Sequence, residues 1–217
     1  MYKRKLKDIY FGSKKTKSVE SDDDTQSDVS EKLSRSKSDT KIERENNHIY
    51  FYSEVDRTSI YELTSLIKEA EIDSIVTSMK LCVDEIPIYI HINSNGGSVF
   101  DCFTCIDAIQ SCKVPVHTII EGASASAATL ISIIGKKRYM TKNAYMLIHQ
   151  LSSCFWGKMN EIEDEYKNLE ELMKKIKSFY KDYTNIPKKE LSELLKHDIW
   201  FDSDKCLKYG LIDELWE

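Results

Sequence analysis

With 217 residues, 41% of them hydrophobic, the chain is long enough for one sizeable hydrophobic core but short for two. Its formal net charge of −5 at pH 7 excludes the overall basic field that nucleic-acid-binding proteins present, so we expect no nucleic-acid partner. No apolar run reaches the length of a membrane span, and the first residues lack the apolar stretch of a secretory signal. We therefore expect a soluble, cytoplasmic protein with no membrane partner; the sequence leaves an organelle or a virus-infected host compartment open.

The N-terminal part of the chain is predicted to be a disordered, charged tail. Residues 12–47 are rich in Ser, Asp, Lys and Glu, and their larger aliphatic residues are Val19, Val29, Leu33 and Ile42. So few apolar side chains do not offset the entropy lost on ordering such a segment. We predict a tail over residues 1–47 and one folded domain over residues 48–217.

From His48 onward the sequence alternates between strand-like and helix-like segments. The segment IPIYIHINS places isoleucine at every second position, which is typical of a strand, and a helix is predicted from Val99 to about Ser111. The next strand-like segment is VPVHTIIEG. Repeated strand, crossover and strand units predict an α/β fold with a largely parallel sheet and helices on its faces. Ligands in such folds bind beyond the carboxyl ends of the strands, where NSNGGS and EGASAS lie.

The chain has six scattered cysteines, as expected for reduced thiols. Cys102 and Cys105 form a CxxC motif, but Phe100, Phe103 and Ile106 recur around them at helical spacing. No second pair of metal-ligand residues follows. We therefore expect buried helix cysteines, with no metal site and no cofactor.

A run of small residues, GASASAA, directly follows the strand-like segment VPVHTIIEG. Small side chains let a substrate backbone come close, so Ser124 or Ser126 is either a packing residue or a nucleophile. His149, at the end of a later strand-like piece, is either a hydrogen-bonded core residue or a general base. Carboxylates that could orient its imidazole follow near the C-terminus, and the residues alone do not choose among them: Asp198, Asp202, Asp204 and Asp213.

Residues 48–216 resemble the proteolytic-subunit family of the Clp protease (ClpP), which are self-compartmentalised serine peptidases. INSNGGSV, at residues 92–99, is similar to that family's INSPGGSV turn, and the small-residue run is similar to its G-x-A-A-S-M-G/A nucleophile segment. MLIHQ resembles the family's MIHQ, and YGLID resembles its closing YGL(I/V)D motif. The four motifs occur in the family's order. The resemblance implies a ClpP/crotonase-like fold, a repeated β-β-α and βαβ spiral with a projecting handle helix.

The resemblance also implies a role for particular residues. The family's nucleophilic serine is the fifth residue counted from the glycine, which selects Ser126 when Gly122 is the first. His149 is the implied base. The family's acid stands eleven positions before the tyrosine of the closing motif, and Asp198 stands eleven before Tyr209.

The implied oxyanion hole consists of the backbone N–H groups of Gly97 and Ala127. The implied function is a serine-type endopeptidase that hydrolyses peptide bonds in unfolded proteins or peptides inside a ring-shaped homo-oligomer, of one or two rings, heptameric in the family. A AAA+ unfoldase is the implied partner. It has weaker support than the peptidase chemistry, because the family's axial-loop region is not recognisable in residues 1–47. Leu151 replaces the proline expected after HQ, a departure that concerns the peptide-binding contacts and the pairing of rings.

A long amphipathic helix is predicted over about residues 159–181. Its apolar residues recur at steps of three and four and form a stripe: Met159, Ile162, Tyr166, Leu169, Leu172, Met173, Ile176, Phe179 and Tyr180. Periodicity alone is compatible with a helix lying on its own sheet. The resemblance implies a handle that buries the stripe against the same helix of a subunit in the facing ring.

Two other functions stay open at this level. The first is a catalytically silent ring subunit, against which the presence of Ser126, His149 and Asp198 argues. The second is a crotonase-type acyl-CoA enzyme, which shares the fold and the paired N–H oxyanion hole but needs no Ser-His-Asp set.

Overall fold

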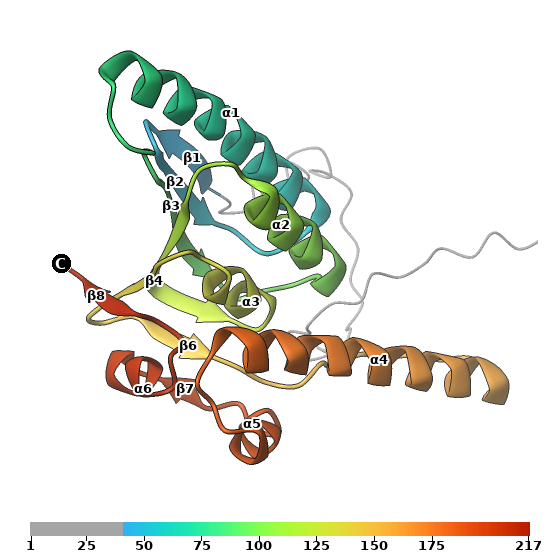
Figure 1. The fold of residues 1–217 in the computed structure, drawn as a ribbon. Helices are drawn as coiled ribbons and strands as arrows, with labels where there is room; N and C mark the ends of the chain where they lie inside the picture. The colour runs from blue at the N-terminus through green and yellow to red at the C-terminus, as the bar shows by residue number, and fades with distance from the viewer. Residues whose placement is uncertain (1–40) are drawn as a thin grey trace, which may run out of the picture.

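The computed structural model describes residues 41–217 (Figure 1). The strands of this part are β1 (Lys41–Glu45), β2 (His48–Tyr52), β3 (Ile88–Ser94), β4 (Val116–Ala125), β5 (Arg138–Thr141), β6 (Tyr145–Leu147), β7 (Trp200–Phe201) and β8 (Glu214–Trp216). Its helices are α1 (Arg57–Leu81), α2 (Val99–Ser111), α3 (Ala127–Ile133), α4 (Met159–Tyr183), α5 (Lys188–Leu194) and α6 (Ser203–Lys208). None of these helices combines the length and the apolar character that crossing a membrane requires.

The strands form one mixed sheet in the order β1-β2-β3-β4-β5-β8, and β6 branches from β4 to pair with β7. The pairs from β2 through β8 along this order are parallel, as is the pair β4–β6, whereas β1–β2 and β6–β7 are antiparallel. Helices α1, α2 and α3 lie together on one face of the sheet (Figure 1). The predicted α/β fold with a largely parallel sheet is confirmed.

The core lies between that face of the sheet and its helices. Ile88, Ile90 and Ile92 are completely buried, which is the outcome of the alternation seen in IPIYIHINS. Helix α1 buries Leu63 and Ile67 on the facing side. Helix α2 has the predicted bounds and buries Cys102 and Cys105 completely, as the helical spacing predicted. Burial raises the pKa of the Cys105 thiol to about 12, so this thiol stays protonated.

The predicted start of the folded domain at residue 48 is wrong by one strand. Strand β1 pairs with β2 in an antiparallel hairpin that sets Ile42 opposite Phe51, and Arg44 forms an ion pair with Asp73 of α1. The single aliphatic residue of β1 carried no local signal, since its strand conformation depends on pairing with β2. Residues 1–40, the rest of the predicted tail, lie outside the described residues.

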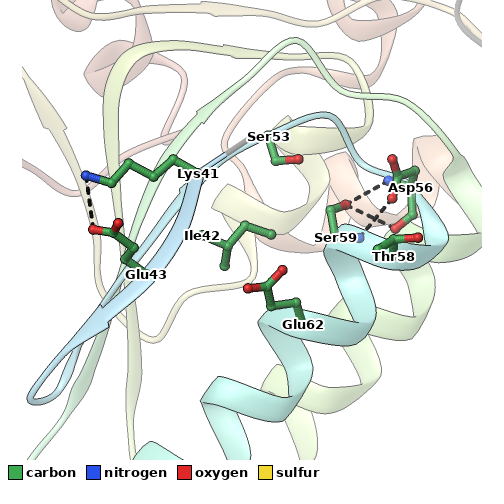
Figure 2. Close-up of a pocket in the computed structure, with 8 residues that line it drawn as sticks. All are labelled: Lys41, Ile42, Glu43, Ser53, Asp56, Thr58, Ser59 and Glu62. Carbon is green, nitrogen blue, oxygen red and sulfur yellow. Dashed lines mark hydrogen bonds and ion pairs between the residues drawn. The ribbon is translucent and has the colours of Figure 1, made fainter. Parts of the chain in front are cut away.

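The start of α1 shows how local sequence sets a helix boundary (Figure 2). The backbone N–H of Ser59 donates to the Asp56 carboxylate over 2.8 Å, and the Asp56 N–H donates to the Ser59 hydroxyl over 3.0 Å. Such reciprocal capping satisfies N–H groups that the helix itself leaves without acceptors. A hollow between this helix start and β1 is lined by Lys41, Ile42 and Glu43 together with residues of the cap, and by none of the candidate site residues.

Helix α4 extends two residues beyond its predicted end. Its C-terminal half packs on the body through Ile176 and Tyr180, which are buried. Its N-terminal half projects from the body and leaves Ile162 and Tyr166 exposed to solvent (Figure 1). The apolar periodicity therefore predicted the helix, and only its N-terminal half projects from the body as the implied handle does.

Candidate active site

The carboxyl ends of three neighbouring parallel strands meet at one edge of the sheet. Strand β4 lies between β3 and β6, with Ser94 opposite Ser124 and Ala125 opposite Leu147. The turn after β3, the first residue after β4 and the segment after β6 therefore lie next to each other. These are the positions of NSNGGS, Ser126 and His149, which the sequence separates by up to 56 residues.

Ser126 occupies a strained turn between β4 and α3. Its φ is 56° and its ψ is −125°, a conformation that costs a non-glycine residue on the order of 1–3 kcal/mol. Its N–H donates to the Leu147 carbonyl over 2.9 Å, which holds the turn against β6. A sharp strand-to-helix turn of this kind presents a nucleophilic side chain at the top of a sheet.

The hydroxyl of Ser126 is not used for structure. Serine at a helix N-cap commonly accepts a hydrogen bond from the first turn, but this side chain does not cap α3. Its Oγ makes no hydrogen bond with any residue in the range 41–217, so the structure does not contain a Ser126–His149 hydrogen bond. Catalytic contacts of this kind are often long before substrate binds. The Ser124 Oγ likewise makes no hydrogen bond in this range, but Ser124 lies inside β4 and its exposed fraction is 0%, against 7% for Ser126.

Strand pairing places His149 beside Asp198. Leu147 of β6 is opposite Trp200 of antiparallel β7, so residues two positions after the first and two before the second also face each other. The His149 Nδ1 lies 3.2 Å from the Asp198 Oδ1. A second link, from the Gln150 N–H to the Leu195 carbonyl over 2.6 Å, holds the two segments together.

The environment of His149 favours the neutral imidazole. Burial lowers its pKa below the ordinary value of 6.5, and the nearby Asp198 carboxylate opposes this change without reversing it. The Asp198 side chain is 78% exposed, so water screens its charge. A neutral imidazole at physiological pH is the form that accepts a proton from a serine hydroxyl.

The other candidate carboxylates have different contacts. Asp202 caps α6 by accepting the Lys205 N–H over 2.9 Å, and Asp204 lies in the first turn of that helix. Asp213 accepts the Arg138 Nε–H over 3.0 Å; burial alone would raise its pKa, but the Arg138 guanidinium outweighs burial and lowers it. Among the four candidates, Asp198 is the one whose carboxylate lies within hydrogen-bond distance of the His149 Nδ1.

The glycine turn after β3 packs directly on the Ser126 turn. A Cβ atom on Gly96 would lie 2.7 Å from the Ser126 Cβ and 2.9 Å from the Ala127 N, closer than real Cβ atoms approach. The Val55 N–H donates to the Gly96 carbonyl, and the Val55 carbonyl accepts from the Ser98 N–H. Gly97 stands between these two bonds in the parallel bridge, so its own N–H faces away from Val55. Ala127 is the first residue of α3, and its N–H has no acceptor within the helix. Both predicted donors thus lie on segments in contact at Ser126.

Sequence reasoning did not single out Thr129, which contacts the Ser126 turn directly. Both its N–H and its hydroxyl donate to the Ser126 carbonyl, over 3.0 Å and 2.6 Å. The available signal was a threonine three residues after the candidate nucleophile, at the start of a helix.

Comparison with known proteins gives the family. The family model for Clp protease matches residues 43–217, nearly all of the described part. The chain belongs to the Clp protease family.

Individual relatives have names of the same kind. The ATP-dependent Clp protease proteolytic subunit 2 of Treponema denticola is 36% identical over 131 residues, 59% of this chain and 66% of that protein. The ATP-dependent Clp protease proteolytic subunit of Streptococcus mutans is 32% identical over 174 residues, 76% of this chain and 88% of that protein. The chain thus spans just under two thirds of the first relative and most of the second.

A solved structure of a ClpP1 mutant from Listeria monocytogenes is similar in fold, with a TM-score of 0.68 and 25% sequence identity. The similarity covers 79% of this chain and 92% of that one. The ClpP-like fold that the motifs implied is therefore confirmed.

Proposed function

We propose that the protein is a serine endopeptidase of the ClpP type, with Ser126 as nucleophile, His149 as general base and Asp198 as the residue that orients the imidazole. The observation that carries this proposal is the 3.2 Å contact between His149 Nδ1 and Asp198 Oδ1, at the same sheet edge as the strained Ser126 turn. A merely structural serine at that position has no need of a histidine–carboxylate contact in the segment that follows the adjacent strand.

The first half of the proposed reaction forms an acyl-enzyme. The Ser126 Oγ attacks the carbonyl carbon of a peptide bond while the His149 Nε2 accepts the hydroxyl proton. Asp198 accepts the Nδ1–H, which keeps the Nε2 lone pair directed at the nucleophile and stabilises the imidazolium. His149 then gives the proton to the amide nitrogen as the carbon–nitrogen bond breaks, and the amine product leaves.

The second half releases the acyl group. A water molecule attacks the ester carbonyl, His149 accepts a proton from it and returns this proton to the Ser126 Oγ, and the carboxylic acid product leaves. In both halves negative charge develops on the carbonyl oxygen. The N–H groups of Gly97 and Ala127 are the proposed donors to this oxygen, and one such donor contributes on the order of 3 kcal/mol to transition-state stability.

We also infer that the active form is a ring-shaped homo-oligomer, heptameric and of one or two rings, that cleaves unfolded proteins or peptides. The exposed apolar residues on the projecting half of α4 support an interface between subunits, because Met159, Ile162 and Tyr166 recur at steps of three and four along it, and a contiguous exposed apolar stripe is typical of an interaction surface. The names of the relatives include "ATP-dependent", which supports an ATP-driven AAA+ unfoldase as the partner.

Covalent labelling tests the proposal directly. The full-length protein should hydrolyse a fluorogenic peptide and react with a fluorophosphonate at Ser126, and Ser126→Ala should abolish both, with a loss of activity approaching about 10⁶-fold. Ser124→Ala is the matched control and should retain most activity, because Ser124 lies inside the sheet. A wild type that neither cleaves peptides nor reacts contradicts the proposal and favours a silent subunit; hydrolysis of an acyl-CoA in its place favours the crotonase-type alternative.

A further inference from the structure

A buried chain of hydrogen bonds connects helix α4 to the Ser126 turn. The Tyr180 hydroxyl of α4 lies 2.5 Å from the Thr129 Oγ1 of α3, and the same Oγ1 lies 2.6 Å from the Ser126 carbonyl oxygen. Thr129 and Tyr180 are exposed by 0% and 1%, so water does not compete for these contacts. The position of the Ser126 carbonyl is therefore fixed by a tyrosine more than fifty residues away in the sequence.

The direction of each hydrogen bond follows from the number of protons. A threonine hydroxyl has one hydrogen, and Thr129 donates it to the Ser126 carbonyl. Tyr180 must then be the donor to the Thr129 Oγ1. Burial raises the pKa of the Tyr180 phenol, so the proton that this bond needs is present throughout the physiological pH range.

The Ser126 carbonyl and the Ala127 N–H belong to one peptide unit. All peptide bonds of residues 41–217 are trans, so the two groups lie in one plane and point in opposite directions. Thr129 holds this carbonyl with two donors, its hydroxyl and its backbone N–H. Fixing the carbonyl therefore also fixes the direction in which the Ala127 N–H points.

We propose that Thr129 and Tyr180 are positioning residues that orient the Ala127 N–H toward the oxyanion of the transition state. This inference rests on the proposed function, since it assigns a role within the same peptidase site. The strained backbone of Ser126 explains why positioning residues are needed, because a peptide unit next to a strained φ rotates unless its surroundings hold it. Both residues act through the Ser126 carbonyl and make no hydrogen bond with the Ser126 Oγ.

The test separates orientation of the donor from stability of the fold. Tyr180→Phe keeps the buried ring and removes the hydroxyl, and Thr129→Val keeps the volume and the backbone N–H donor but removes the hydroxyl donor to the Ser126 carbonyl. We expect each variant to lower kcat for a fluorogenic peptide by about tenfold, the scale of one net hydrogen bond, while KM changes by less than about twofold. The affinity for a peptide aldehyde, whose adduct with Ser126 places an oxygen in the oxyanion position, should fall in parallel with kcat.

Two further variants serve as controls. Thr129→Ser keeps the hydroxyl and should restore activity to near the wild-type level. Tyr183→Phe removes a hydroxyl from the next turn of α4, where the partner is Gln110 on α2, and should leave both kcat and aldehyde affinity unchanged. The double variant of Thr129→Val and Tyr180→Phe should be no slower than Thr129→Val alone, because the two residues act through one carbonyl.

The outcomes are distinct. This inference is overturned, and the proposed function is left intact, if the wild type is active but Tyr180→Phe and Thr129→Val behave like Tyr183→Phe. The same holds if these two variants raise KM alone. An inactive wild type that does not react with the fluorophosphonate overturns the proposed function and this inference with it. If Tyr180→Phe fails to fold, the comparison of Thr129→Val with Thr129→Ser still decides, because equal activity of these two excludes a role for the hydroxyl.

Discussion

Gly96 packs so closely against Ser126 that a Cβ atom on Gly96 would lie 2.7 Å from the Ser126 Cβ. A Cβ atom at Gly96 would also lie 2.6 Å from the Ala125 carbonyl oxygen, and the φ of Gly96 is +92°, which L-residues rarely adopt. The turn and the candidate nucleophile are thus fitted to each other through a glycine. The close contact between the two segments explains why NSNGGS and GASASAA both have small residues at this point.

The contact predicts that Gly96→Ala inactivates the peptidase. The added methyl group would meet the backbone and the Ser126 side chain, so the Ser126 turn or the glycine turn has to shift, and the positive φ adds strain of about 1–3 kcal/mol. Peptide hydrolysis and the thermal unfolding midpoint measure the two effects. Gly157→Ala is the control: its φ is not in the positive region and its Cβ would meet the flexible Glu161 carboxylate. Equal activity of the two variants would show that the turn does not set the site.

Asp198→Asn is expected to lower kcat by about 10⁴-fold with the fold intact, because the amide favours the wrong tautomer of His149. Asp202→Asn is the matched control. Asp202 caps α6, and asparagine caps helices as well as aspartate does, so this variant should be close to neutral. Steady-state peptide hydrolysis compares them. A larger loss for Asp202→Asn would mean that Asp198 is not the orienting carboxylate.

The rate should depend on pH through His149. Burial lowers the pKa of this imidazole below 6.5, and only the neutral form accepts the Ser126 proton. Activity is therefore present above the pKa of His149 and lost as the pH falls through it. We expect the acid limb of the kcat/KM profile to have its midpoint below 6.5. A midpoint above 6.5 would contradict the assignment of His149 as base, or the burial that lowers its pKa.

The projecting half of α4 is expected to carry the subunit interface. Ile162 and Tyr166 are 44% and 63% exposed, whereas Leu172 packs partly against the core of its own subunit. The double variant Ile162→Asp and Tyr166→Asp should therefore fold but dissociate a large oligomer and lose activity. Asn160→Asp with Asn168→Asp adds the same charge to exposed positions of α4 and is the control. Sedimentation velocity measures the oligomeric state of the three proteins, and a monomeric wild type would contradict the proposed ring.

Two truncations test where the folded domain begins. Deletion of residues 1–40 leaves β1 in place and should leave peptide hydrolysis and the unfolding midpoint largely unchanged. Deletion of residues 1–47 also removes the pairing of β1 with β2 and the ion pair of Arg44 with Asp73, and should lower the midpoint. If the shorter deletion already unfolds the protein, the segment before Lys41 is structural.

Local sequence determined those features that depend on residues near one another in the chain. The alternating isoleucines of β3 are buried because a strand turns every second side chain to the same face, and the helical spacing around Cys102 placed that thiol in the core. Resemblance to a family then pointed to Ser126, His149 and Asp198. The same local signals failed at β1, where one aliphatic residue among charges was too weak to indicate a strand.

Tertiary structure decided what depends on segments far apart in the sequence. The residues alone left four carboxylates open, and the antiparallel register of β6 with β7 brought Asp198 to His149, while Asp202 and Asp213 found partners elsewhere. The contact of Tyr180 with Thr129 likewise arises only when α4 packs on α3. The physical reason is that periodicity reports which face of an element is apolar, whereas the register between strands and the packing of helices fix which polar groups meet.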